Sequence, residues 1–217
     1  MKLIDALLEL LYPSRCAFCH RLLRDPADKV CARCRRELPY TDEAAREQSF
    51  PSVKRCVSPL YYENDVRQSL HRYKFSQRTG YAGIYADFVI KCIDECGLTC
   101  DYISWVPLSA RRLRSRGYDQ ARLLAGAIAE RLSVPCIGTL RKVRDTRPQS
   151  LTGGAEKRRE NIRGAYRCTD EETVRGKTIL LIDDIVTTGS TLSECARTLK
   201  NAGAAAVYAA AVARKRP

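Results

Sequence analysis

Short apolar runs alternate with segments of helical periodicity from about residue 56 to the end of the chain. Runs rich in β-branched and aromatic residues predict strands at residues 56–62, 101–108, 135–143, 178–182 and 205–214. Apolar residues three or four positions apart predict helices at residues 65–76, 80–96, 118–132 and 191–203. Strands that alternate with helices through short connections form mainly parallel sheets covered by helices, so we expect an α/β domain here.

The N-terminal quarter of the chain lacks this alternation. Residues 1–12 carry leucines at helical spacing with two acidic residues between them, which predicts a short amphipathic helix ending near Pro13 rather than a signal peptide or a membrane span. Residues 38–55 combine prolines with mixed charge, which predicts a loop or linker. We therefore expect two domains, with bounds 1–55 and 56–217.

Four of the eleven cysteines form two Cys-x-x-Cys pairs: Cys16, Cys19, Cys31 and Cys34. Each pair can place two thiolates on one metal ion, and two pairs complete the tetrahedral site that Zn²⁺ prefers. His20 could compete as a ligand, and four free thiols are the alternative in a reducing compartment. Because four protein ligands leave no open position, we expect a structural zinc site in a segment too small to build a good core alone.

The charge of the chain is strongly positive, with a formal net charge of +13 whose excess is concentrated in residues 106–165. Such a block suits phosphate-rich ligands, either a nucleotide-like metabolite or nucleic acid, although a merely solvated basic surface has the same composition. No apolar run reaches the length of a membrane span. We expect a cytoplasmic protein, in which eleven cysteines need a role other than disulfides.

The stretch TILLIDDIVTTGSTL, residues 178–192, places two carboxylates directly after an apolar strand and follows them with hydroxyls around a glycine. Ligands of open parallel sheets bind beyond the carboxyl ends of the strands, where Asp183 and Asp184 are expected. Ionised carboxylates only accept hydrogen bonds, so their partners are hydroxyl groups or a hard cation. The hydroxyls, Gly189 and the N–H groups at the start of the next helix are suited to binding a phosphate. Ribose 5-phosphate carries both kinds of group, hydroxyls for the carboxylates and a phosphate for the helix start.

Two other phosphate-binding signatures are absent, because the chain has neither a Gly-Lys-Ser/Thr ending nor a Gly-x-Gly-x-x-Gly run. The sequence LLIDDIVTTGSTL instead resembles the phosphoribosyl pyrophosphate (PRPP) signature of type I phosphoribosyltransferases. Together with the cysteine module, VPLSARRLRSRGYDQARLLA and RDTRPQSLTGGAEKRRENIRGAY are similar to the ComF family, the competence protein F or GntX-like proteins. This resemblance covers nearly the whole chain. It implies a type I phosphoribosyltransferase fold, a mainly parallel sheet flanked by helices, with a small N-terminal four-cysteine zinc module.

The resemblance also implies roles for individual residues. Asp183 and Asp184 would take the ribose hydroxyls of PRPP and help to hold Mg²⁺. The 5-phosphate would lie against Thr187, Thr188, Gly189, Ser190 and Thr191. The turn at residues 108–111 would meet the pyrophosphate, and residues 144–160 would form a mobile flap over the site.

Arginines near the turn and the flap support the binding of a dense anion. Four follow a predicted strand end, namely Arg111, Arg112, Arg114 and Arg116. Four more flank the glycine pair of the flap, namely Arg144, Arg147, Arg158 and Arg159. Each of them alone is also typical of a solvated surface. The candidates for contacts to pyrophosphate are Arg111, Arg112, Arg116, Arg147 and Arg158.

Two hypotheses for the function follow. In the first, the protein is a magnesium-dependent phosphoribosyltransferase that displaces pyrophosphate from the anomeric carbon of PRPP, while Mg²⁺ and arginines stabilise the departing charge and the flap excludes water. Its acceptor is unknown: Tyr118, Tyr166, His71 and Lys74 are candidates for contacts to it, without a recognisable pattern.

In the second hypothesis, the protein binds PRPP without catalysis, or binds single-stranded DNA, and acts in DNA uptake, as the family's competence name implies. Its partners would be DNA or proteins of the competence machinery. Arg33, Arg35 and Arg36, beside the second cysteine pair, and the basic C-terminal residues would contact DNA. A plain scaffold or a subunit contact is the alternative role for this module.

Overall fold

The centre of the fold is a six-stranded sheet. The computed structural model describes residues 13–145 and 160–216. The strands follow the order β1-β2-β8-β7-β4, and β3 pairs with β8. Their bounds are β1 Glu47–Phe50, β2 Val53–Val57, β3 Leu60–Tyr61, β4 Tyr102–Trp105, β7 Thr178–Val186 and β8 Ala206–Arg214. Every strand pair that the described residues form in this sheet is parallel except β1 with β2, which confirms the predicted mainly parallel sheet.

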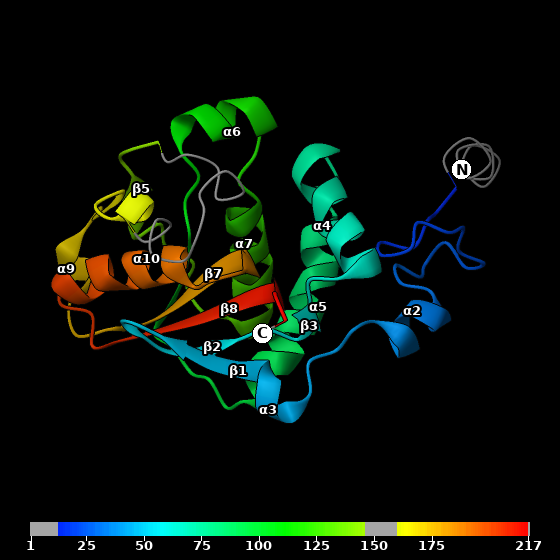
Figure 1. Cartoon of the computed structure of the whole chain (residues 1–217), viewed down its shortest axis with the longest axis horizontal. Helices are drawn as coiled ribbons and strands as arrows, with labels where there is room; N and C mark the ends of the chain where they lie inside the picture. Colours follow the sequence, from blue (N-terminus) through cyan, green and yellow to red (C-terminus); the bar gives the residue numbers. More distant parts are fainter. Residues whose placement is uncertain (1–12, 146–159, 217) are drawn as a thin grey trace.

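Helices cover both faces of the sheet (Figure 1). The longer helices are α4 Asn64–Phe75, α5 Tyr81–Glu95, α7 Gln120–Leu132 and α10 Ser190–Asn201. The shorter ones are α2 Ala32–Glu37, α3 Glu43–Arg46, α6 Ala110–Arg116 and α9 Glu171–Val174. Along β7, Leu180 and Ile182 pack in the core with α5 and α7, whereas Ile179 and Leu181 pack in the core with α10. A strand buried on both faces is apolar at every position, which explains the run that predicted β7.

The structure corrects two expectations from the sequence. Residues 38–55, expected as a loop, contain α3, β1 and the start of β2. Of the strand predicted at 135–143, Leu140–Lys142 form β5, which pairs with β6, Tyr166–Cys168, in a separate antiparallel sheet. Short strands such as these are fixed by their pairing partners rather than by local pattern, so periodicity misses their bounds. The predicted domain boundary between residues 55 and 56 falls within β2 and stays a prediction.

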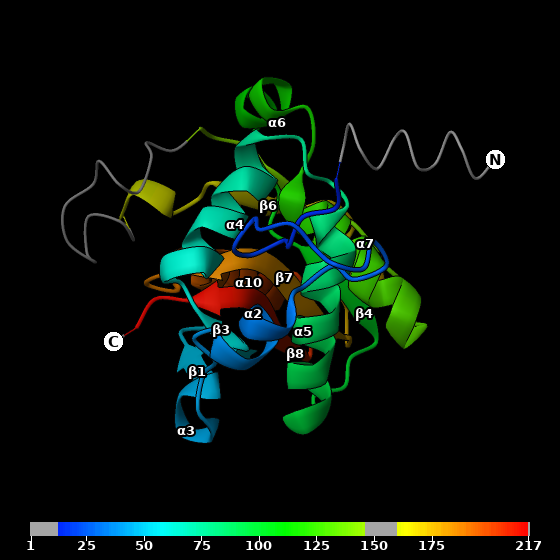
Figure 2. The ribbon, with the colours of Figure 1, turned by 90° about the vertical axis from the view of Figure 1, so that its right-hand side faces the viewer.

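The N-terminal module packs against α4 and α5 (Figure 2). The Phe18 ring is fully buried and contacts the Tyr85 ring of α5 edge-on, with 5.9 Å between the centroids. The carbonyl oxygen of Ala17 accepts hydrogen bonds from Ser69 Oγ at 2.6 Å and from Arg72 Nη2 at 3.1 Å, both on α4. Helix α4 therefore holds the backbone next to Cys16 directly through these hydrogen bonds.

Two predicted segments fall largely or wholly outside the described residues. The N-terminal helix was expected at residues 1–12, and most of the flap was expected at residues 146–159. Within residues 13–145 and 160–216, none of the helices combines the length and the apolar character that crossing a membrane requires.

Candidate functional site

The acidic pair lies near the carboxyl end of β7. Asp183 is in register with Ala211 of β8, and β7 continues beyond the pair to Val186. The carboxylates therefore lie inside the strand rather than after it. Because successive side chains of a strand point to opposite faces, Asp183 lies toward α10 and Asp184 lies toward α4. The contacts agree, since Asp183 lines a cavity with the start of α10 and Asp184 pairs with Lys74 of α4.

The turn between β7 and α10 requires a glycine. Gly189 has a φ of 69°, in the left-handed region, and a Cβ at this position would lie 2.3 Å from the Phe50 ring of β1. Gly189 is also the N-cap of α10 and makes no side-chain capping bond. Gly189 itself therefore offers no side chain to the first N–H groups of this helix, which suits its N-terminus to an anion.

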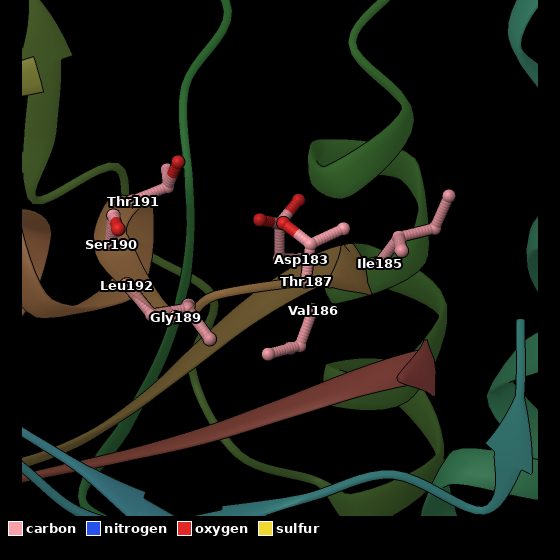
Figure 3. A pocket seen from close by; sticks show the side chains of 8 residues that line it. All are labelled: Asp183, Ile185, Val186, Thr187, Gly189, Ser190, Thr191 and Leu192. Carbon is pink, nitrogen blue, oxygen red and sulfur yellow. The ribbon is translucent and has the colours of Figure 1, made fainter. Parts of the chain in front are cut away.

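Hydroxyl groups surround the same turn. The hydroxyls of Thr188 and Ser190 share a hydrogen bond of 2.9 Å. Figure 3 shows the side chains of Asp183, Thr187 and Thr191 pointing to the same side, and all three line the cavity there. The structure thus brings Asp183 together with Thr187, Ser190 and Thr191 around one small cavity, whereas Asp184 and Thr188 do not belong to the lining that the described residues give it.

Asp119 organises the opposite wall of the site. Its Oδ2 accepts a hydrogen bond from the Leu108 N–H at 2.9 Å, and its Oδ1 accepts from the Arg122 N–H at 3.2 Å, which caps α7. Ser109 caps α6 by accepting from the Arg112 N–H at 3.4 Å. The turn after β4 is therefore fixed by a carboxylate on one side and by a helix cap on the other.

A cleft of about 590 Å³ lies between these two walls. Its acidic lining residues are Asp119, Asp183 and Asp184. Its basic lining residues are Lys74 of α4, Arg112 and Arg116 of α6, and Lys142 of β5. A ligand that carries both hydroxyl groups and negative charge can therefore contact acceptors and cations in the same cleft.

The predicted arginines divide into three groups. Arg112 and Arg116 line the cleft. Arg111 is exposed and does not belong to the lining that the described residues form. Arg147 and Arg158 lie outside the described residues. The structure thus places part of the predicted arginine cluster beside the acidic pair.

Burial in the cleft disfavours the ionised forms of several groups. Burial, and then the charge of Asp184, raises the pKa of Asp183 to about 8, although Lys74 and the Asp184 N–H act in the opposite direction. Burial, and then the charge of Arg112, lowers the pKa of Lys142 to about 8. Charged groups that are disfavoured in this way are frequent at binding sites, because a ligand of opposite charge reverses the penalty.

Several lining residues were not singled out from the sequence, among them Phe75, Asp119 and Lys142. Asp119 had a usable signal, because an aspartate near the start of a predicted helix is a typical N-cap. Phe75 and Lys142 had none, since they reach the cleft from α4 and β5, far from the acidic pair in the sequence.

The candidates for acceptor contacts also separate. His71, Lys74 and Tyr166 line the cleft. Tyr118 does not belong to the lining among the described residues, and its hydroxyl donates to the carbonyl oxygen of Tyr73. Of these candidates, the residues of α4 and β6 therefore line the cleft and Tyr118 does not.

The four cysteines form a second, compact site whose ligand atoms lie within 4.8 Å of one another, and His20 is not part of this group. Four sulfur donors at this separation fit a tetrahedral zinc site. Burial opposes ionisation of Cys16, but N–H donors led by that of Cys31 lower its pKa to about 7. Burial, and then the neighbouring thiols, raises the pKa of Cys34. A bound cation supplies the positive charge that lets all four thiols ionise together.

Comparison with protein families assigns a family to each of these regions. The double zinc ribbon domain matches residues 7–49, and the phosphoribosyl transferase domain matches residues 119–217. With the cysteine cluster and the mainly parallel sheet, these matches confirm the type I phosphoribosyltransferase fold with an N-terminal zinc module. They also support the structural role predicted for zinc.

Curated relatives match this chain over most of its length. DNA utilization protein YhgH of Salmonella typhimurium is 31% identical over 200 residues, which cover 88% of this chain and 86% of that protein. The chain belongs to the ComF family. Competence protein F of Haemophilus influenzae is 25% identical over 211 residues, which cover 87% of this ComF-family chain and 92% of that protein. The family resemblance of the sequence is therefore confirmed.

Two solved structures similar to this ComF-family chain belong to larger proteins. The allosteric regulatory enzyme of purine biosynthesis is 20% identical with a TM-score of 0.43, and the match covers 64% of this chain and 29% of that chain. Glutamine PRPP amidotransferase from B. subtilis is 19% identical with a TM-score of 0.43, and this match also covers 64% of this chain and 29% of that chain. The chain thus spans less than a third of either protein.

Proposed function

We propose that this ComF-family protein binds PRPP together with Mg²⁺ and transfers its phosphoribosyl group to an acceptor. The observation that carries the proposal is the position of Asp183 and Asp184 in one cleft with Thr187, Arg112 and Arg116. PRPP carries a 5-phosphate, two ribose hydroxyls and a pyrophosphate in this order around one ring. The cleft offers a helix N-terminus, two carboxylates and a pair of guanidinium groups as their partners.

In this proposal each polar part of PRPP has its own partners. The 5-phosphate lies against residues 187–191, where hydroxyls and the first N–H groups of α10 donate hydrogen bonds. The acidic pair accepts hydrogen bonds from the ribose hydroxyls. The pyrophosphate lies beside the turn at Leu108 and the guanidinium groups of Arg112 and Arg116, which suit its oxygens.

The acidic pair also fits Mg²⁺. Carboxylate oxygens are the hard ligands that this cation prefers, and a cation near Asp183 would reverse the rise in its pKa. When bound with PRPP, Mg²⁺ would supply positive charge that stabilises the departing pyrophosphate. The ligands of the cation would be Asp183, Asp184 and oxygens of PRPP.

The proposed transfer is a displacement at the anomeric carbon. The bond from this carbon to the pyrophosphate oxygen breaks, pyrophosphate leaves with the electron pair, and a lone pair of the acceptor forms the new bond. Arg112 and Arg116 stabilise the leaving charge electrostatically, which is the main help that an oxocarbenium-like transition state needs. The flap, with Arg147 and Arg158, is expected to exclude water, and its part stays a prediction.

Calorimetry with PRPP and Mg²⁺ tests the binding step. We expect the wild type to bind, and Asp184→Asn to bind at least about 100-fold more weakly, because hydrogen bonds to charged groups contribute about 1.5–3 kcal/mol each. The matched control is Asp94→Asn, an exposed carboxylate on α5, which should bind like the wild type. No PRPP binding by the folded wild type would refute the proposal.

Mass spectrometry tests the transfer step. The protein is incubated with PRPP, Mg²⁺ and a panel of nucleobases and amines, and products that contain the phosphoribosyl group are sought. A product formed by the wild type and not by Asp184→Asn supports the enzyme. PRPP binding without any product and without pyrophosphate release favours a non-catalytic PRPP-binding protein.

A second proposal is binding of single-stranded DNA in DNA uptake. Arg33, Arg35 and Arg36 are exposed on α2 beside the cysteine cluster, and the relatives are named DNA utilization protein and competence protein. Arg33 pairs with Glu37 at 2.8 Å and Arg35 with Asp28 at 3.6 Å, which offsets part of this charge. Salt-sensitive oligonucleotide binding that is lost when the three arginines become alanine would support it; equal binding would refute it. Single-stranded DNA or competence-machinery proteins would then be the partners of a cytoplasmic protein.

A further inference from the structure

Lys74 connects the two sides of the cleft through an ion pair with Asp184. Its Nζ lies 2.8 Å from Asp184 Oδ2, and the two side chains are 20% and 12% exposed. The surface pair of Lys91 with Glu95 is far more open, with side chains 77% and 39% exposed. Lys74 belongs to α4 and Asp184 to β7, so the pair is a tertiary contact. A shielded pair of this kind interacts more strongly than an exposed one.

The position of Lys74 matters because carboxylates crowd this part of the cleft. Asp183 directly precedes Asp184 on β7, and Asp119 lines the same cleft. Like charges that are close together in a partly buried site repel strongly. The ammonium group of Lys74 offsets part of this repulsion, and it does so at an oxygen of Asp184.

A divalent cation that binds Asp184 at Oδ2 competes with the Lys74 ammonium for that oxygen. The ammonium occupies Asp184 Oδ2 at 2.8 Å. A divalent cation such as Mg²⁺ binds a carboxylate oxygen at about 2.1 Å, and two cations on one oxygen repel each other. A ribose hydroxyl that donates to Asp184 also competes with the three N–H donors of Lys74. Lys74 must therefore move before the oxygen can serve a ligand.

We propose that Lys74 is a built-in counter-ion of the acidic pair, which a divalent cation displaces when Asp184 takes part in ligand binding. The identity of the natural ligand rests on the proposed function, but the competition with a cation does not require PRPP. A cation that displaces Lys74 must break this ion pair. The free energy that the pair contributes to the empty cleft therefore weakens cation binding by the same amount. Lys74 thereby keeps affinity for metal alone low until a ligand brings a cation and hydroxyl groups together.

The displaced ammonium group of Lys74 can also bind an anionic ligand. Lys74 lines the cleft with Arg116, so after its displacement it stays near the space where we place an anionic ligand. An ammonium group donates to phosphate oxygens as readily as to a carboxylate. Lys74 is thus a positioning residue that changes partner between the empty and the occupied cleft.

Binding of Mn²⁺ alone to the zinc-loaded protein, measured by electron paramagnetic resonance of the free ion, tests the proposal. We expect Lys74→Met to bind Mn²⁺ about tenfold more tightly than the wild type, within the roughly 5–150-fold range of coupling between competing ligands. Lys74→Arg keeps the charge and should remain close to the wild type. Lys91→Met removes an exposed lysine and should also match the wild type. Asp184→Asn provides the background.

Each outcome decides the question. Equal or weaker Mn²⁺ binding by folded Lys74→Met overturns the proposal, and so does the lack of binding above the Asp184→Asn background in every variant. A tenfold gain together with a wild type that does not bind PRPP would refute the proposed function and leave the counter-ion role standing. The two proposals can therefore fail separately.

A second measurement applies if Lys74→Met does not fold. Lysines of the wild type are methylated with ¹³C, and the Lys74 signal is assigned by its loss in Lys74→Arg. We expect this signal to shift in a saturable way as Mg²⁺ is added, while the signal of Lys91 stays unchanged. A Lys74 signal that does not move throughout the titration overturns the proposal.

Discussion

The cysteine cluster and the acidic pair are both groups of like-charged ligands, but the protein encloses the first and leaves the second open. Cys16 and Cys34 are buried, and four sulfur ligands leave a metal no free position. Asp183 and Asp184 line a cleft of about 590 Å³, where a lysine offsets part of their charge. In our proposals, the closed site uses its metal to stabilise the fold, whereas the open site keeps unfavourable charges for a ligand that binds and leaves.

One helix contacts both regions. On α4, Ser69 and Arg72 donate to the carbonyl oxygen of Ala17 beside the cysteine cluster. Lys74, two residues after Arg72, pairs with Asp184 in the cleft. The two sites are therefore not expected to be independent, because a change at the cysteine cluster should affect the cleft through α4.

Loss of the metal should have the largest effect. We expect Cys34→Ser to lose zinc and to lower the melting temperature by more than about 10 °C, because metal binding at such sites is coupled to folding. Zinc content by mass spectrometry and melting by circular dichroism check this. The control is Cys136→Ser, an exposed cysteine outside the cluster, which should change neither. A zinc-free Cys34→Ser protein that melts like the wild type would contradict the structural role.

The turn of the open site should tolerate no side chain at Gly189. Gly189→Ala forces an alanine into positive φ against the Phe50 ring, so we expect a stability loss of about 1–3 kcal/mol. PRPP affinity should fall about 100-fold, since misplacement of a binding group by 1 Å can have an effect of that size. Denaturant melts and calorimetry check this.

The matched control for that change is Gly126→Ala. Gly126 lies inside α7, and a Cβ there meets no atom within 4 Å. Alanine is the better helix former by up to about 1 kcal/mol, so this variant should be as stable as the wild type or more so, with unchanged PRPP binding. Equal PRPP binding by both glycine variants would show that the α10 N-terminus does not hold the ligand.

The two regions also differ in how far the sequence predicts them. The cysteine cluster and the turn at 187–191 consist of residues close together in the chain, so their spacing and chemistry could be interpreted directly. The helices and long strands after residue 56 were predictable for the same reason, since periodicity is local. Phe50 under Gly189 was not, because β1 exists through its pairing with β2. Lys74 and Lys142 reach the cleft by tertiary packing, which no local pattern encodes.

The link through α4 should have a moderate effect. Arg72→Met removes donors to the backbone of the zinc module, and we expect the protein to keep its zinc while PRPP binding weakens about 3- to 10-fold. Calorimetry and zinc analysis check this. Arg67→Met, an exposed arginine on the same helix, is the control and should bind PRPP normally. Unchanged PRPP affinity in folded Arg72→Met would show that the two regions are independent.

Removal of a disfavoured charge from the open site should have the smallest effect, and should stabilise the empty protein. The pKa of Lys142 is lowered to about 8, first by burial and then by Arg112, from an ordinary value of 10.5. Above this ordinary value the lysine is neutral in both the folded and unfolded chain. As the pH falls from 10.5 through 8, the unfolded chain takes up a proton that the folded chain resists, so the folded state loses stability. We therefore expect Lys142→Met to melt about 2–4 °C above the wild type near pH 7, and this gain to shrink toward pH 10.

Thermal melts at both pH values, with Lys91→Met as the exposed control, check this expectation. The same Lys142→Met substitution should weaken PRPP binding. An anionic ligand favours the protonated form of Lys142, and the variant has no ammonium group to offer it. A variant that gains stability and loses affinity together would show that the open site gives up folding stability for ligand binding. A variant that is less stable at pH 7 than at pH 10, relative to the wild type, would show instead that the Lys142 charge stabilises the empty cleft.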